Sequence, residues 1–277
     1  MPELPEVETI ARSLDDVLRS KTIKEVKFFR DSLREKIPTL KVKEVLEGET
    51  VEEVFRRAKY IIIKTKKGLV FSHLGMTGNF LNTKDLSPQK KHTHLIISYK
   101  LSKSKLQALH YIDPRRFGRL TAQSSLSWQK HPWFIKNGSE PLENKELGKY
   151  LHQKSKNKKV PIKNFLMKPE VLVGVGNIYA CEALFLSQVK PSRPCENISL
   201  STWKTLAQNI KKVLKQAIKA GGTSIKDFRK LEDEKGYFKQ SLFVYGRENK
   251  NCYTCKANIQ RIVQAGRSSW FCPNCQV

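Results

Sequence analysis

Two Cys-x-x-Cys pairs near the end of the chain constrain its fold more than any other feature. Cys252 and Cys255 form the first pair, Cys272 and Cys275 form the second, and sixteen residues lie between the pairs. This spacing is typical of a tetrahedral zinc site in which each pair supplies two thiolates and the residues between them form a hairpin. Four protein ligands leave no open coordination position. The sequence therefore predicts one structural Zn²⁺ that does not activate water.

Two other interpretations of these cysteines are disulfide pairing and a thioredoxin-like redox pair. The chain begins with acidic residues and lacks the basic region and apolar stretch of a secretory signal. We therefore expect a reducing, cytoplasmic environment, in which zinc binding is favoured over disulfide formation. Cys181 and Cys195 are expected to be ordinary reduced thiols in that environment.

The spacing of apolar residues changes along the chain. From Pro5 to about Ser20 they recur at helical spacing, which predicts an amphipathic helix with one buried face. Beyond it, short segments rich in β-branched and aromatic residues are separated by turn residues, a pattern typical of antiparallel strands. The expected strands lie near 22–30, 50–57, 60–65, 69–73, 93–100, 107–113 and 117–122.

Strand patterning ends at the stretch 128–141, which contains two prolines and an Asn-Gly pair. Helices are predicted after it, near 143–154, 158–167, 177–187 and 199–220. The expected fold class is α+β and multidomain: an antiparallel β-sandwich that begins with a helix, then a helical domain, then the cysteine unit. The expected boundaries are 1–131 for the sandwich, 132–142 for a linker, 143–240 for the helical domain and 241–277 for the cysteine unit.

Positive charge is concentrated outside the first part of the chain. The whole chain carries 52 Lys and Arg against 26 Asp and Glu, but residues 1–53 carry 10 basic and 13 acidic side chains. A surplus of this size in the remainder indicates a polyanionic partner such as nucleic acid. A membrane role is disfavoured, because no segment is a clean basic amphipathic helix and no apolar run approaches the roughly 20 residues needed to cross a bilayer.

A glycine-rich turn precedes one of the predicted helices. Gly174 and Gly176 come just before Asn177, which stands where a helix N-cap is expected. Exposed N–H groups at such a helix start favour a phosphate. The alternative is a tight turn between helices with an ordinary asparagine cap. Nearby positive charge favours the phosphate interpretation, and it comes from Lys154, Lys156, Lys158, Lys159, Lys163 and Lys168.

Several separated motifs resemble those of bacterial formamidopyrimidine-DNA glycosylases, in order and across essentially the whole chain. They are MPELPEVET at the start, RRAKY at 56–60, HLGMTG at 73–78, DPRRFG at 113–118, GVGNIYA at 174–180, GGTSIKDF at 221–228, YGR at 245–247 and the two Cys-x-x-Cys pairs. The resemblance implies a β-sandwich that begins with the catalytic helix, a helix-two-turn-helix domain with a lesion-capping loop, and a zinc finger.

The resemblance also implies an activity: base-excision repair by a monomeric enzyme that removes oxidised purines from duplex DNA and then cuts the strand at the abasic site. Removal of Met1 would leave Pro2 with a free amine, whose pKa near 8 leaves a useful neutral fraction at pH 7. The implied roles are attack on the sugar by Pro2, acid–base assistance by Glu3, a place beside the sugar for Glu6 and positioning of the lesion by Lys59. On elementary grounds alone, Pro5 and the glutamates are only a helix cap.

Other residues match DNA contacts of the family. Met76, Arg115 and Phe117 match the trio that fills the space left by the flipped nucleotide, with Arg115 on the orphaned cytosine and Phe117 as the wedge. Lys226 falls in the loop that closes over the flipped base. The remaining expected DNA contacts are His73, His94, Lys159, Asn177, Tyr245 and Arg267. His92 and His94 are also considered as metal ligands, but no third ligand lies near them in the sequence.

Two rival functions stay open at the level of sequence. An endonuclease VIII type enzyme performs the same chemistry on oxidised pyrimidines, but its opening typically reads PEGPE, whereas this chain has Pro2-Glu3-Leu4-Pro5-Glu6. A non-catalytic relative would bind DNA through the finger and the helical domain alone. The presence of Pro2, Glu3 and Lys59 disfavours it, since binding needs no free proline amine. As a DNA-binding bacterial protein, the chain is expected in the cytoplasm, associated with the nucleoid.

Overall fold

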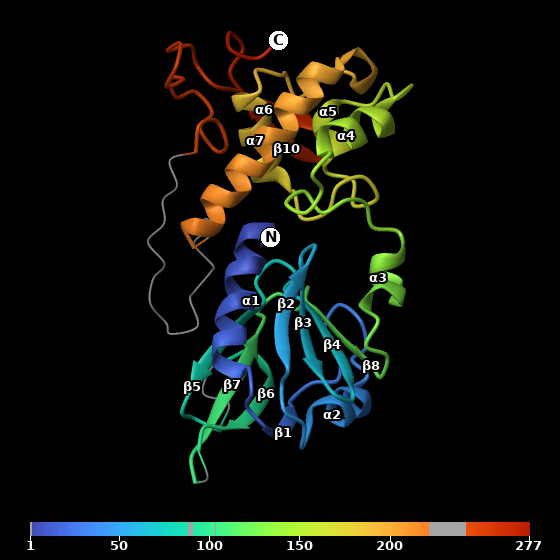
Figure 1. The fold of residues 1–277 in the computed structure, drawn as a ribbon. Coiled ribbons are helices and arrows are strands. Elements are labelled where there is room, and N and C mark those ends of the chain that lie inside the picture. The colour runs from blue at the N-terminus through green and yellow to red at the C-terminus, as the bar shows by residue number, and fades with distance from the viewer. Residues whose placement is uncertain (1, 88–90, 103, 222–241) are drawn as a thin grey trace. The chain divides into compact units, whose positions relative to one another are not determined.

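The computed structural model describes residues 2–87, 91–102, 104–221 and 242–277. The described residues form two compact units, one within residues 1–131 and one within residues 132–220 and 239–277. Figure 1 shows the elements of each unit. Within the described ranges, no helix is both long enough and apolar enough to span a membrane.

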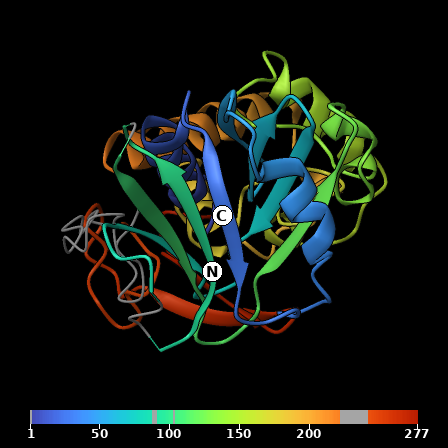
Figure 2. The ribbon, with the colours of Figure 1, turned by 90° about the horizontal axis from the view of Figure 1, so that it is seen from below.

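The first unit contains helix α1 (Leu4–Leu18) and two four-stranded antiparallel sheets (Figures 1 and 2). One sheet has the order β1-β6-β7-β5, formed by Ile23–Phe28, Thr93–Lys100, Leu106–Ile112 and Asn79–Thr83. The other has the order β2-β3-β4-β8, formed by Glu53–Arg57, Tyr60–Thr65, Gly68–His73 and Arg119–Gln123.

One apolar core joins the two sheets and the helix. Val26 and Leu109 of the first sheet belong to the same buried cluster as Ile63 and Val70 of the second. Helix α1 adds Val7, Ile10 and Leu14, which recur every three or four residues and therefore share one face. The predicted sandwich with a helix at its start is confirmed.

Two elements of this unit were not predicted. Helix α2 (Thr39–Leu46) buries Val42, Val45 and Leu46 and lies against β8 and β1 (Figure 2). Its i, i+3, i+4 spacing is a helical signal, but it is only two turns long. Strand β5 is an edge strand in which Phe80 is the buried residue, so its apolar signal is weak.

The second unit is mainly helical. Its longest helix, α7 (Leu200–Lys219), buries an apolar stripe that includes Trp203, Leu206 and Ile210 against α4 and α6. The Ser199 hydroxyl caps its start by accepting from the Thr202 amide at 3.2 Å. The shorter helices are α3 (Pro132–Ile135), α4 (Leu147–Ser155), α5 (Ile162–Leu166) and α6 (Asn177–Leu186), with 3₁₀ turns at Trp128–Lys130 in the first unit and Cys195–Asn197 in the second.

The C-terminal end of the second unit is a β-hairpin, β9 (Gln260–Gln264) paired with β10 (Arg267–Phe271). Helix α6 is apolar on nearly all sides, which suits its place between α5, α7 and strand β10 of the hairpin. Cys181 and Phe185 of α6 pack in one cluster with Cys252 and Cys272. The predicted helices and the cysteine hairpin are confirmed.

Candidate active site and DNA-binding surface

The start of α1 is held by a reciprocal capping box. The Glu3 carboxylate accepts from the Glu6 amide, and the Glu3 amide donates to Glu6 Oε2 at 2.9 Å. Both carboxylate side chains and Pro2 are buried; Glu3 is 3% exposed and Glu6 is 2% exposed. The cap that the sequence predicts therefore buries two carboxyl groups at the start of α1, one of them on the residue that follows Pro2.

Lys59 lies in the tight turn between β2 and β3, after Ala58, whose φ of 54° is left-handed. Arg56 ties this turn to α1. Its Nε donates to Glu8 Oε2 at 2.7 Å and its Nη1 to the Ala58 carbonyl at 3.0 Å. Burial opposes ionisation of Glu8, but the hydrogen bonds and charges of Arg56 and Arg12 outweigh it and hold the Glu8 pKa below its usual value.

His73 lies opposite Tyr60 on the neighbouring strand, with their ring centroids 4.9 Å apart. The Gly75 amide donates to His73 Nδ1 at 3.0 Å, so the neutral ring carries its proton on Nε2. Burial, followed by the positive charges of Lys59, Arg119 and Arg34, lowers the His73 pKa to about 4. At neutral pH His73 is therefore an uncharged hydrogen-bond donor within a basic region.

Met76, Arg115 and Phe117 lie on two loops that touch through their backbones. Met76 is 38% exposed and Phe117 41% exposed, and the Arg115 guanidinium lies 4.8 Å from the Phe117 ring centroid. Gly75 packs directly on the second loop, because a Cβ atom built on it would lie 2.4 Å from the Phe117 carbonyl carbon. The structure thus brings the trio into one exposed group.

His94 lies in strand β6. It is buried, and its Nε2 atom lies 2.8 Å from the Asp113 carbonyl. Because a carbonyl accepts only, Nε2 carries the proton. This contact supports the 113–118 turn, and a direct DNA contact by His94 stays a prediction. The metal-ligand alternative for His92 and His94 is corrected, since the one cluster of metal-ligating side chains within the described ranges is formed by four cysteines.

Those four cysteines, Cys252, Cys255, Cys272 and Cys275, have their sulfurs within 4.8 Å of one another. The sulfurs of Cys252 and Cys275 lie 3.9 Å apart and those of Cys255 and Cys272 lie 3.3 Å apart, well above the roughly 2.0 Å of a disulfide bond. Four sulfurs about 2.3 Å from a zinc ion form a tetrahedron of this size. The site fits one structural Zn²⁺, and the disulfide interpretation is wrong.

Asn177 is the first residue of α6, and Gly176 is its N-cap. The predicted asparagine cap is therefore wrong. The Asn177 side chain instead donates to the Ser268 carbonyl on the zinc hairpin at 3.0 Å. Lys163, buried in α5, donates to the same carbonyl at 2.8 Å and to the Ser269 hydroxyl at 2.6 Å. The helical part and the hairpin of this unit are thus joined at Ser268 and Ser269.

The remaining expected DNA contacts of the second unit differ in exposure. Arg267 begins β10 and is exposed, as is Lys159 before α5. Tyr245 is partly buried against Trp270, with ring centroids 4.4 Å apart. Lys226 lies outside the described residues.

Two buried carboxylates that hold loops near the expected DNA contacts were not predicted from the sequence. One holds residues 243–245, and the other holds the two loops that carry Met76 and Arg115. Glu182 of α6 accepts the amides of Phe243, Val244 and Tyr245 at 2.7 to 3.0 Å. Burial raises the Glu182 pKa despite these bonds. Asp113, fully buried, binds the two loops of the first unit. The signal for Asp113 was its place at the head of DPRRFG; nothing local marks Glu182.

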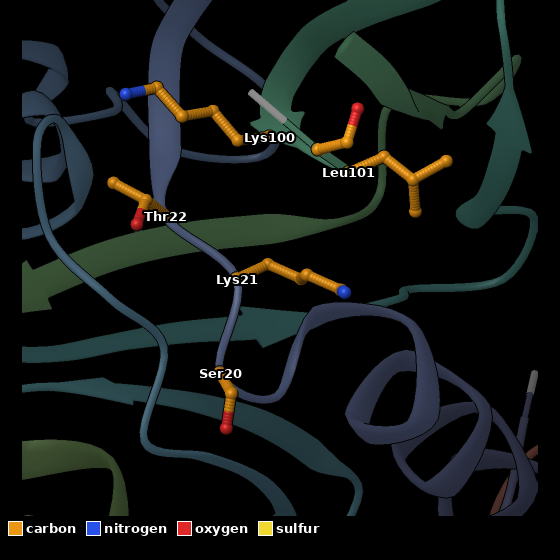
Figure 3. A pocket seen from close by; sticks show the side chains of 6 residues that line it. Ser20, Lys21, Thr22, Lys100 and Leu101 are labelled. Atoms are coloured by element: carbon orange, nitrogen blue, oxygen red, sulfur yellow. The ribbon is translucent and has the colours of Figure 1, made fainter. Parts of the chain in front are cut away.

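A separate polar pocket in the first unit is lined by Ser20, Lys21, Thr22, Lys100, Leu101 and Ser102. Figure 3 shows that the side chains of Lys21 and Lys100 point away from each other. No charged groups converge in this pocket, and it contains none of the expected site residues.

Comparison with known proteins agrees with the geometry. Three family models match in order: the formamidopyrimidine-DNA glycosylase N-terminal domain over residues 1–120, the formamidopyrimidine-DNA glycosylase H2TH domain over 138–229, and a zinc finger found in FPG and IleRS over 250–277. A formamidopyrimidine-DNA glycosylase of Ruthia magnifica is 41% identical over 276 residues and covers the whole of both chains.

Two solved structures of the Lactococcus lactis protein superpose on nearly the entire chain. One is its complex with DNA containing an abasic site, with 31% identity, a TM-score of 0.87 and 99% of both chains covered. The other is a variant bound to DNA containing Fapy-dG, with 32% identity, a TM-score of 0.88 and the same coverage. With identity, fold and cysteine site in agreement over its full length, the chain belongs to the formamidopyrimidine-DNA glycosylase family.

Proposed function

We propose that this protein is a bifunctional repair enzyme: a DNA glycosylase that removes oxidised purines, such as 8-oxoguanine and formamidopyrimidines, from duplex DNA, and an AP lyase that cuts the strand at the abasic site. Family membership supports this activity, as do the abasic and Fapy-dG DNA bound by the Lactococcus lactis relative. The observation that carries it furthest is the start of α1, where Pro2 is buried beside Glu3 and Glu6.

The chemistry uses the amine of Pro2 after Met1 has been removed. The amine bonds to C1′ of the damaged nucleotide, the bond from C1′ to the base breaks, and the base leaves with a proton. The resulting iminium acidifies the neighbouring sugar carbon, so β and then δ elimination release both phosphates. Glu3 assists opening of the sugar ring by proton transfer, and Glu6 keeps Glu3 in place through its bond to the Glu3 amide.

DNA contacts are proposed in both units. Lys59 positions the lesion and its phosphate, and neutral His73 donates from Nε2 to a phosphate oxygen. Met76, Arg115 and Phe117 fill the space that the flipped nucleotide leaves, which suits a flexible thioether, a planar donor and an aromatic wedge. Further phosphate contacts are proposed for Lys159, Asn177, Tyr245 and Arg267. A contact near the flipped base is proposed for Lys226, which lies outside the described residues.

The zinc ion is structural and holds the hairpin that carries Arg267. When bound, it supplies no acid or nucleophile, because four thiolates complete its coordination. We expect the enzyme to act as a monomer in the cytoplasm, associated with the nucleoid through its DNA affinity.

Borohydride trapping tests the proposal. Protein with a verified Pro2 N-terminus is incubated with duplexes containing 8-oxoguanine opposite cytosine or an oxidised pyrimidine, and the adduct is mapped by peptide mass. A purine-dependent adduct on Pro2 is expected. No adduct with any lesion, despite salt-sensitive duplex binding, would favour the non-catalytic relative, and an adduct mainly with pyrimidines would favour the endonuclease VIII type.

The role of Glu3 has a matched control in the same helix. Glu3→Gln is expected to slow base release by about 10²-fold or more, since proton transfer by a positioned carboxyl contributes that much. Asp16→Asn removes an exposed carboxylate of α1 and is expected to leave the rate unchanged. Equal rates for Glu3→Gln and wild type, measured in single turnovers, would contradict the assignment.

A further inference from the structure

The loops that carry Met76 and Arg115 are fastened by a buried polar group centred on Asp113. The Thr77 hydroxyl donates to Asp113 Oδ1 at 2.5 Å, and the Gly118 amide donates to Oδ2 at 2.8 Å. His94 Nε2 donates to the Asp113 carbonyl at 2.8 Å. Asp113 is fully buried, so its carboxylate binds the two loops out of contact with water.

The Thr77 hydroxyl is the atom through which the first loop reaches Arg115. A hydroxyl has one proton, and Thr77 gives that proton to Asp113 Oδ1. A lone pair remains, and it accepts the Arg115 amide at 3.2 Å. Thr77 Oγ1 thus connects residues 38 positions apart and fixes the backbone from which the Arg115 side chain extends.

The Arg115 side chain itself is exposed, and its contact with Phe117 is a cation–π interaction at 4.8 Å. An exposed contact of this kind is worth no more than one hydrogen bond, so the backbone to which the side chain is attached also sets its direction. That backbone is held to the first loop by the bond from the Arg115 amide to Thr77.

We propose that Thr77 is a positioning residue that sets the choice of the base opposite the lesion, by fixing the backbone of Arg115 through its hydroxyl. This inference rests on the proposed function, in which Arg115 contacts the orphaned cytosine. Thr77 touches neither the sugar nor the amine of Pro2 in that scheme. Its loss is expected to weaken discrimination of the opposite base and to spare strand cleavage at an abasic site.

The test compares Thr77→Val, which keeps the shape and removes the hydroxyl, with Thr77→Ser, which keeps the hydroxyl. Thr50→Val is the matched control, because it removes a hydroxyl that bonds to Thr22 at 3.3 Å in the same unit. Single-turnover excision of 8-oxoguanine is measured opposite cytosine and opposite adenine, together with cleavage at a preformed abasic site and the melting temperature.

Thr77→Val is expected to reduce the preference for cytosine by roughly tenfold, the effect of losing one to two hydrogen bonds. Abasic-site cleavage should stay within about twofold of wild type, and Thr77→Ser and Thr50→Val should keep the wild-type preference. An unchanged preference in Thr77→Val, or an equal loss of excision opposite both bases and of abasic-site cleavage, overturns the inference. If Thr77→Val does not fold, Thr77→Ala is measured in its place.

Binding to a duplex with a tetrahydrofuran abasic analogue separates this inference from the proposed function. It measures the preference for cytosine over adenine opposite the analogue without any chemistry. A wild-type protein that binds with this preference but excises nothing would overturn the proposed function alone. Loss of the binding preference in Thr77→Val would then still support the role of Thr77.

Discussion

At the scale of single residues, the shape of the site depends on backbone positions that admit few side chains. Gly75 combines a φ of +63° with close packing on Phe117 and Gly118. The left-handed conformation costs a residue with a Cβ about 1–2 kcal/mol. At Gly75 the Cβ would also overlap the backbone of the loop that carries Phe117.

Gly75→Ala is therefore expected to lower the free energy of unfolding by more than the conformational cost of about 1–2 kcal/mol. Gly48→Ala is the matched control, since Gly48 has a φ of +79° and no atom within 4 Å of its Cβ position. Urea unfolding of both variants measures the difference. Equal losses in the two variants would show that packing of Gly75 on Phe117 contributes nothing.

His73 predicts a pH dependence of stability. Its pKa is about 4 in the folded protein and near 6.5 in the unfolded chain. Between these values the unfolded chain binds a proton that the folded protein does not, so stability rises with pH across this window. The His73 contribution is complete above about pH 6.5 and is lost as the pH falls towards 4.

Urea midpoints measured from pH 7 to pH 4 check this expectation. His73→Gln should show a shallower loss of stability on acidification than wild type. His131, whose pKa burial also lowers, contributes in the same direction in both proteins, so the difference between the two curves reports His73. Parallel curves would contradict the assignment.

At the scale of elements, polar contacts attach α1 to the edge strand β2. Asp15 Oδ1 accepts the Val54 amide at 2.7 Å, which satisfies a donor on the open edge of the sheet. About two helical turns earlier, the Glu8–Arg56 pair extends the attachment to the Lys59 turn. The helix that carries Pro2 is thereby held to the strand that leads to Lys59.

Arg56→Met is expected to destabilise the first unit by about 1–3 kcal/mol. It removes the hydrogen bonds that the buried Arg56 side chain donates to Glu8 and to the Ala58 carbonyl. Arg12→Ala is the control: Arg12 binds the same carboxylate at 2.8 Å but is 67% exposed, and exposed pairs contribute about 0–1 kcal/mol. Thermal unfolding compares the two. A larger loss in Arg12→Ala would refute this account of the attachment.

At the scale of the whole molecule, net charge and the zinc hairpin both bear on DNA affinity. The chain carries a formal charge of +26, so binding of the phosphate backbone should weaken steeply with salt. The hairpin that carries Arg267 packs on α6 through Cys252 and Cys272, and Lys163 and Asn177 hold its backbone. A metal held by the four cysteines would therefore support the hairpin and its attachment to α6.

Cys272→Ser is expected to lose zinc and to bind lesion-containing duplex more weakly, since the hairpin folds around the metal. Zinc content and duplex affinity are measured on the variant and on wild type before and after chelation. Restoring zinc to the chelated wild type should restore affinity, while the variant should not respond. Unaltered binding after zinc removal would contradict the role of the finger.

Much of this architecture was predictable from local sequence. Helical spacing from Pro5, alternating strands, helices after residue 142 and the two Cys-x-x-Cys pairs each depend on residues near one another in the chain. Local patterns determine these features because hydrogen-bonding periodicity and ligand spacing act over a few residues. The motifs also indicated the family, because their residues and their order along the chain can be recognised from the sequence alone.

The tertiary structure alone decided how distant residues support those motifs. His94 bonds a carbonyl 19 positions away, Thr77 bonds a carboxylate 36 positions away, and Asn177 bonds a carbonyl 91 positions away. No local pattern encodes these partners, because they depend on which strands pair and which loops pack together. The sequence determined most of the elements and the chemical groups of this protein, and long-range packing decided which groups are exposed and which hold them in place.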